Sequence, residues 1–136
     1  EHDTRIARLA GKADRVLVDA PCSGLGTLRR NPDLKYRQSA ETVANLLEQQ
    51  HSILDAASKL VKPQGRLVYA TCSVLPEENE LQVERFLSEH PEFELVNCAE
   101  LLQSLKIDLD TGKYLRLNSG EHQTDGFFAT VLQRKD

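Results

Sequence analysis

Two cysteines, Cys22 and Cys72, carry the side chains of this chain that are best suited to covalent chemistry. Each follows a short apolar run, at residues 15–18 and 66–70, that predicts a buried strand. If the two strands are parallel, their carboxyl ends meet at one edge of the sheet, where α/β sheets bind ligands. A thiol there is a potential nucleophile, although with a pKa of about 8.5 only a few per cent is thiolate at neutral pH.

Taken alone, either cysteine is more simply explained as an ordinary buried thiol, because free cysteine packs like a small hydrophobic residue. The segments around them change that interpretation. Residues 19–24 (DAPCSG), 30–36 (RNPDLKY), 71–79 (TCSVLPEEN) and 125–128 (DGFF) resemble, in order and spacing, the signature segments of the Sun-type RNA cytosine-5 methyltransferases of the RsmB kind. A single short match arises easily by chance, but four in register favour the family.

The resemblance implies covalent catalysis on RNA, with S-adenosylmethionine as the methyl donor and small-subunit ribosomal RNA as the favoured substrate. Carbon 5 of cytosine is a poor nucleophile, and a thiolate that adds at carbon 6 converts the ring into an enamine able to attack a methyl sulfonium. In the family, the cysteine after Thr in the second signature forms this bond, which corresponds to Cys72. The cysteine of the first signature resolves the adduct, which corresponds to Cys22. The target base would have to leave its stack to reach the thiol.

Asp19 and Pro21, which precede Cys22 in the sequence, extend the predicted site. The resemblance implies that Asp19, at the end of the first strand, borders the cofactor pocket; a plain loop-capping role is the alternative. Pro21 is a candidate substrate-binding residue, because its fixed φ can turn the neighbouring thiol and carbonyls toward the pocket.

A basic cluster follows this loop. Arg30 and Lys35, together with Arg29, are candidate contacts to RNA phosphates, and Tyr36 could stack on a base. A solvated basic face is an equally open interpretation. The formal net charge of −4 provides no general attraction to nucleic acid, so we expect much of the RNA binding to come from elsewhere.

The elements that must position these residues alternate between strands and helices. Strands are predicted at 15–18, 66–70, 93–98 and 126–132, and helices at 39–61, 76–89 and 99–104. Cys98 falls on a predicted apolar strand and is assigned to the core. This order predicts an α/β fold, which the resemblance identifies as the C-terminal half of a Rossmann-like class I methyltransferase sheet, mostly parallel with a final antiparallel strand.

The composition agrees with one globular unit. Hydrophobic residues make up 40% and charged residues 28%, and no apolar run approaches the roughly 18 residues of a membrane span. We expect a cytoplasmic protein with reduced thiols and neither a metal site nor a membrane anchor, because the cysteines and histidines form no ligand cluster.

The chain starts at Glu1 and contains no Met, so we expect it to be a piece of a longer protein. Residues 1–136 would form a partial methyltransferase catalytic domain that lacks the first cofactor-binding half and any N-terminal RNA-binding domain. The isolated piece should be inactive. Its first strand should have an unpaired edge, leading to self-association or to cover by residues 6–10.

Three other interpretations remain. A non-catalytic RNA-binding or ribosome-assembly module would bind RNA without forming an adduct through Cys72. A redox protein would pair Cys22 with Cys72, and would need an accessible thiol of low pKa and Cα atoms within about 7 Å. An enzyme that methylates an exocyclic nitrogen would need no cysteine after the second strand, so Cys72 argues against it.

Overall fold

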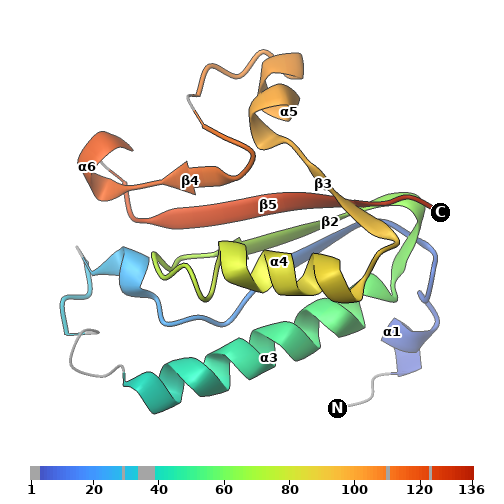
Figure 1. Cartoon of the computed structure of the whole chain (residues 1–136), viewed down its shortest axis with the longest axis horizontal. Helices are drawn as coiled ribbons and strands as arrows, with labels where there is room; N and C mark the ends of the chain where they lie inside the picture. The colour runs from blue at the N-terminus through green and yellow to red at the C-terminus, as the bar shows by residue number, and fades with distance from the viewer. Residues whose placement is uncertain (1–3, 29, 34–38, 110, 123) are drawn as a thin grey trace.

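The computed structural model describes residues 4–28, 30–33, 39–109, 111–122 and 124–136 (Figure 1). In chain order the elements are α1 (Thr4–Ala7), β1 (Ala13–Asp19), η1 (Leu25–Thr27), α3 (Ala40–Ser58), β2 (Val61–Thr71), α4 (Glu80–Glu89), β3 (Phe93–Val96), α5 (Cys98–Ser104), β4 (Leu115–Leu117), α6 (Ser119–His122) and β5 (Phe127–Arg134).

Within the described residues, five strands form one mixed sheet in the order β1-β2-β5-β3, with β4 also pairing with β5. β1 and β2 are parallel, whereas β5 is antiparallel to β2, β3 and β4. The other four strands therefore share one direction, and the last strand runs against them. This confirms the prediction of a mostly parallel α/β sheet with a final antiparallel strand.

The core lies between the sheet and the helices α3 and α4, which contact each other (Figure 1). Alternate strand residues Leu67, Tyr69, Phe128 and Leu132 face this layer, and each is at most 1% exposed. Helix α3 contributes Leu54 and α4 contributes Phe86 to the same cluster. The buried aromatic and aliphatic surface supplies the main stabilisation, since burying one such side chain contributes about 1.5–3 kcal/mol.

Helix α3 begins at the predicted N-cap. The Ser39 hydroxyl accepts a hydrogen bond from the Thr42 backbone N–H, and the Thr42 hydroxyl accepts one from the Ser39 N–H. The helix ends at Ser58, three residues earlier than predicted. An irregular start to β2 then accommodates Gln64, whose φ is 68°, and Gly65, where a Cβ would lie 2.9 Å from the Lys62 carbonyl oxygen.

Three sequence-based predictions need correction. The helix predicted from residue 76 begins only at Glu80, because residues 75–79 form tight turns in which the Glu78 and Asn79 N–H groups bond the carbonyls three residues earlier. Cys98 is buried as predicted, but it opens α5 instead of ending β3. Strand β4 was not predicted, because three residues carry too little periodicity to be recognised.

β1 forms an edge of the sheet, and β2 is its one strand partner among the described residues. Leu17 on this strand is 69% exposed. Ile6 from α1 shares a shallow apolar hollow with Val16 and Leu17, yet Ile6 itself is 52% exposed. The N-terminal segment therefore lies beside the edge without covering it.

Candidate active site

The two thiols meet at the carboxyl ends of β1 and β2. The parallel register pairs Asp19 with Ala70, and the Ala20 N–H donates to the Ala70 carbonyl over 2.9 Å, so the loops leave the sheet side by side. Cys22 Sγ then lies 3.3 Å from Cys72 Sγ, and both side chains are half-buried free thiols. This confirms that the crossover brings together cysteines 50 positions apart.

Burial and the neighbouring sulfur both perturb the Cys22 thiol. The pKa of Cys22 is raised from 9.0 to about 12. Burial is the larger cause of this rise, and the hydrogen bond with Cys72 is the second. Cys22 therefore keeps its proton at neutral pH. When Cys72 is ionised, the Cys22 S–H donates to the Cys72 sulfur and stabilises the thiolate. The Cys22 sulfur of this pair therefore carries a proton that it can share with its neighbour.

Two glycines bring a third loop against the thiol pair. The Gly26 N–H donates to the Cys72 carbonyl over 2.8 Å, and the Gly126 N–H donates to the Gly26 carbonyl over 2.7 Å. A Cβ on Gly26 would lie 2.5 Å from the Cys72 carbonyl oxygen, so only glycine allows this approach. The segments 19–24, 71–79 and 125–128 therefore converge in space, as their shared resemblance predicts.

A buried carboxylate lies beneath the two cysteine loops. Glu78 is 0% exposed and accepts the Ser23 backbone N–H and the Ser23 hydroxyl, each over 2.7 Å. The Ser73 hydroxyl also donates to it, and Gln50 Nε2 on α3 lies 3.2 Å from Oε1. Residue 78 falls inside the helix predicted at 76–89, but it precedes α4, and its carboxylate joins residues adjacent to both cysteines.

Asn79 fixes the turn that carries Cys72. Its side-chain amide donates to the Ser73 carbonyl over 2.9 Å, and its side-chain oxygen accepts the Thr71 hydroxyl over 2.6 Å. Both Thr71 and Asn79 are at most 2% exposed. Residues 78 and 79 belong to a segment that carried the family resemblance, but no spacing rule indicated what they bind.

The other predicted site residues lie around this centre. Asp19 is exposed at the end of β1, and Pro21 is exposed while its carbonyl accepts a hydrogen bond from Gln50 Nε2 over 2.9 Å. Arg30 Nε lies 3.6 Å from Asp125 Oδ2, which links the second and fourth resemblance segments. Lys35, Arg29 and Tyr36 lie outside the described residues.

The described residues offer one candidate contact to the expected cofactor. Asp19 has an exposed carboxylate at the edge of the sheet where α/β folds bind ligands. The Gly24–Leu25–Gly26 turn after β1 packs against the protein itself, because the backbones of Cys72 and Gly126 fill the space beside Gly26. The described residues form no cluster of three or more His, Cys, Asp or Glu that could hold a metal ion. None of the described helices is long and apolar enough to cross a membrane.

The redox interpretation is weakened by these surroundings. The Sγ atoms are close enough for exchange chemistry, but burial raises the pKa of Cys22, so Cys22 is not the accessible, low-pKa thiol that a redox pair needs. No compact CxxC motif supports it either.

Known proteins resemble this chain along most of its length. The family model for 16S rRNA methyltransferase RsmB/F matches residues 1–133. The probable ribosomal RNA small subunit methyltransferase B of Synechocystis sp. is 44% identical over 121 residues, covering 89% of this chain and 27% of that protein. Ribosomal RNA small subunit methyltransferase B of Vibrio cholerae is 43% identical over 122 residues, covering 90% of this chain and 26% of that protein.

Solved structures show the same fold. The crystal structure of PH0851 superimposes with a TM-score of 0.81 at 39% identity, covering 92% of this chain and 27% of that one. NSun6 from Pyrococcus horikoshii with SFG superimposes with a TM-score of 0.77 at 26% identity, covering 100% of this chain and 34% of that one. The chain spans about a quarter of the length of the curated relatives it matches. On its sequence and its fold, this chain belongs to the RsmB/F family of 16S rRNA methyltransferases.

Proposed function

We propose that the protein containing this chain transfers a methyl group from S-adenosylmethionine to carbon 5 of a cytosine in small-subunit ribosomal RNA, with Cys72 as the nucleophile and Cys22 as its partner. The observation that carries the proposal is the 3.3 Å approach of the two Sγ atoms at the carboxyl ends of neighbouring parallel strands. Family membership supports the methyl donor and the RNA, and a related structure contains SFG, an analogue of that donor.

The chemistry divides between the two sulfurs. The Cys72 thiolate adds to carbon 6 of the cytosine, and the resulting enamine makes carbon 5 nucleophilic. The bound cofactor supplies a methyl group on a positively charged sulfur. After carbon 5 has taken the methyl group, its proton is lost to solvent and the bond between Cys72 and carbon 6 breaks.

Cys22 acts in this last step as a hydrogen-bond donor. Its raised pKa keeps the proton on its sulfur, 3.3 Å from Cys72 Sγ. As the adduct breaks, electrons return to the Cys72 sulfur, and the adjacent S–H stabilises the departing thiolate. Without this donor, Cys72 is a poorer leaving group and the protein remains attached to its RNA.

Several residues extend the proposal to binding. Asp19 would contact the cofactor or the amino edge of the base, and Pro21 would hold the loop facing the substrate. The exposed Arg30, paired only loosely with Asp125 at 3.6 Å, and Lys35 would contact phosphates. We also propose that the protein containing this chain is cytoplasmic.

Residues 1–136 form, on this proposal, one part of the catalytic domain, and the isolated chain is inactive. The chain covers only 27% and 26% of the length of two relatives, which supports the proposal that it is one part of a larger protein. Isolated copies associate through the edge of β1, where Leu17 and the apolar hollow beside it face solvent.

The test uses the full-length protein with S-adenosylmethionine and small-subunit ribosomal RNA. Cys72→Ala should abolish methylation at carbon 5, and Cys22→Ala should accumulate a covalent protein–RNA adduct that migrates slowly on a denaturing gel. If Cys72→Ala still methylates carbon 5, the mechanism is wrong. If the wild-type protein binds RNA without methylating it and Cys22→Ala traps no adduct, the alternative of a non-catalytic RNA-binding or ribosome-assembly module holds.

A further inference from the structure

Glu78 is a buried carboxylate that the proposed chemistry does not use. Its side chain is 0% exposed, and within the described part of the chain no Lys, Arg or His forms an ion pair with it. A buried charge without a cation is costly unless several donors surround it. Four donors do so here: the Ser23 N–H, the Ser23 hydroxyl, the Ser73 hydroxyl and the Gln50 amide.

Both serines are immediate neighbours of the thiols. Ser23 follows Cys22 and Ser73 follows Cys72, so one carboxylate holds both loops at the position next to each sulfur. The serine hydroxyls lie 3.3 Å apart, the same separation as the two sulfurs. The distance between the thiols is therefore coupled to the reach of the Glu78 side chain.

Glu78 is itself held both at its backbone and at its side chain. The buried Tyr69 hydroxyl donates to the Glu78 carbonyl over 2.6 Å, and burial together with the nearby Glu78 charge raises the pKa of Tyr69, so this donor stays protonated. At the side chain, Gln50 Nε2 donates to the Glu78 carboxylate. The Gln50 side-chain oxygen, Oε1, in turn accepts a hydrogen bond from Gln82 Nε2 over 3.2 Å.

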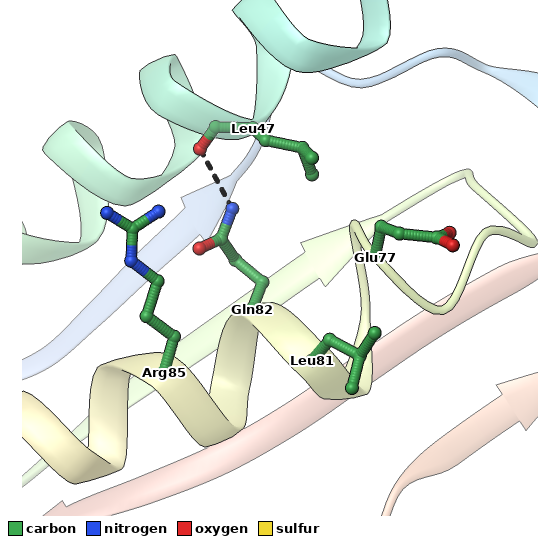
Figure 2. Close-up of a pocket in the computed structure, with 5 residues that line it drawn as sticks. All are labelled: Leu47, Glu77, Leu81, Gln82 and Arg85. Atoms are coloured by element: carbon green, nitrogen blue, oxygen red, sulfur yellow. Dashed lines mark hydrogen bonds between the residues drawn. The ribbon is translucent and has the colours of Figure 1, made fainter. Parts of the chain in front are cut away.

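Gln82 anchors the far end of this network. Figure 2 shows its amide donating across the gap between α4 and α3 to the Leu47 carbonyl, a distance of 2.9 Å. The network thus runs from the helix pair through Gln50 to Glu78 and the two loops. The loops are fixed to the rigid helical layer as well as to the sheet.

We propose that Glu78 is a positioning residue for the thiol pair: its buried carboxylate sets the separation of Cys22 and Cys72 through Ser23 and Ser73. The catalytic meaning of this role rests on the proposed function, but the geometric role does not. Glu78 acts through the loops and touches neither sulfur.

The experiment compares Glu78→Gln and Glu78→Asp with Glu77→Gln in the full-length protein. Glu77 is the exposed neighbouring carboxylate, so its substitution removes the same charge outside the network. The first readout is the rate at which diamide links Cys22 to Cys72 as a disulfide, followed by peptide mass spectrometry. The second is the single-turnover rate of methylation together with the apparent affinity for RNA.

We expect Glu78→Gln and Glu78→Asp to slow the cross-link at least threefold and to lower the methylation rate 10- to 100-fold, with RNA affinity changed less than twofold. Glu78→Asp shortens the side chain by one carbon, and Glu78→Gln replaces one carboxylate oxygen by an amide nitrogen. Either change removes hydrogen bonds that hold at least one of the two loops. Glu77→Gln should match the wild type in every readout. Unchanged cross-linking in both Glu78 variants overturns the positioning role, as does a methylation rate that falls only with the folded fraction.

Two further outcomes are distinguishable. If the wild-type protein does not methylate carbon 5, the proposed function fails, while the cross-linking rates still decide the role of Glu78. If the Glu78 variants do not fold, Ser73→Ala takes their place, because it removes one donor beside Cys72 and leaves the carboxylate intact. Slower cross-linking in folded Ser73→Ala supports the proposal, and an unchanged rate refutes it.

Discussion

Replacing Gly26 by alanine should separate the thiol loops while leaving both cysteine side chains chemically unchanged. The added Cβ would lie 2.5 Å from the Cys72 carbonyl oxygen and 2.6 Å from the Gly126 carbonyl oxygen. Ordinary van der Waals contact begins near 3.4 Å, so the Cys72 backbone must retreat by about 0.9 Å or Gly26 must move away from it. Neither atom is the end of a flexible side chain, so the displacement passes directly to the loop that carries Cys72.

The magnitude follows from this shift. Overpacking of a buried site costs about 1–3 kcal/mol, and two short backbone hydrogen bonds, of 2.8 and 2.7 Å, are stretched at the same time. A misplacement of about 1 Å at a reacting group can lower a rate about 100-fold. We therefore expect Gly26→Ala to lower the methylation rate of the full-length protein about 100-fold and to reduce its stability by about 1–3 kcal/mol.

The assay measures single-turnover methylation and the midpoint of urea unfolding in parallel. Gly112→Ala is the matched control, because a Cβ at Gly112 meets nothing within 4 Å. This control should keep wild-type activity and stability. If Gly26→Ala is as active and as stable as Gly112→Ala, the close approach of the three loops does not position Cys72, and the reasoning fails.

Four other predictions follow from the structure. Iodoacetamide at pH 8 should modify Cys22 about 1000-fold more slowly than an exposed thiol, since a pKa raised from 9.0 to about 12 leaves about a thousandth of the thiolate; equal rates in a mass-spectrometric time course would contradict the assignment. The folded protein keeps the Cys22 proton to higher pH than the unfolded chain, so the contribution of Cys22 to stability is intact below about pH 9 and is lost as pH rises toward 12. Between these two pH values, the urea midpoint should therefore fall less for Cys22→Ala than for the wild type. Leu17→Lys should convert an associating isolated chain into a monomer in sedimentation velocity, and a wild-type chain that is already monomeric would refute association through β1. Arg30→Ala should reduce the slope of log affinity for RNA against log salt by about 1, whereas an unchanged slope would exclude Arg30 as a phosphate contact.

Much of the fold could be predicted because its signals are local. The apolar runs of β1, β2 and β5, the Ser39 cap of α3 and the helical spacing that follows it each lie within a few neighbouring residues. Errors occurred where tertiary contacts override local preference. Pro76 suits a helix start, yet the turns at residues 75–79 carry Glu78 into the interior and delay α4 to Glu80. Strand β4 exists because β5 pairs with it.

The sequence by itself determined the candidates for reaction, Cys22 and Cys72, each after a strand and within segments that resemble one enzyme family. Residue type and spacing along the chain are sufficient for that inference, because they fix the chemical groups and the ends of the elements. Only the tertiary structure decided the 3.3 Å separation of the sulfurs, the retained proton on Cys22 and the burial of Glu78 between the two loops. These properties depend on distances and on exclusion of water between segments 50 or more residues apart, and no local pattern encodes either quantity.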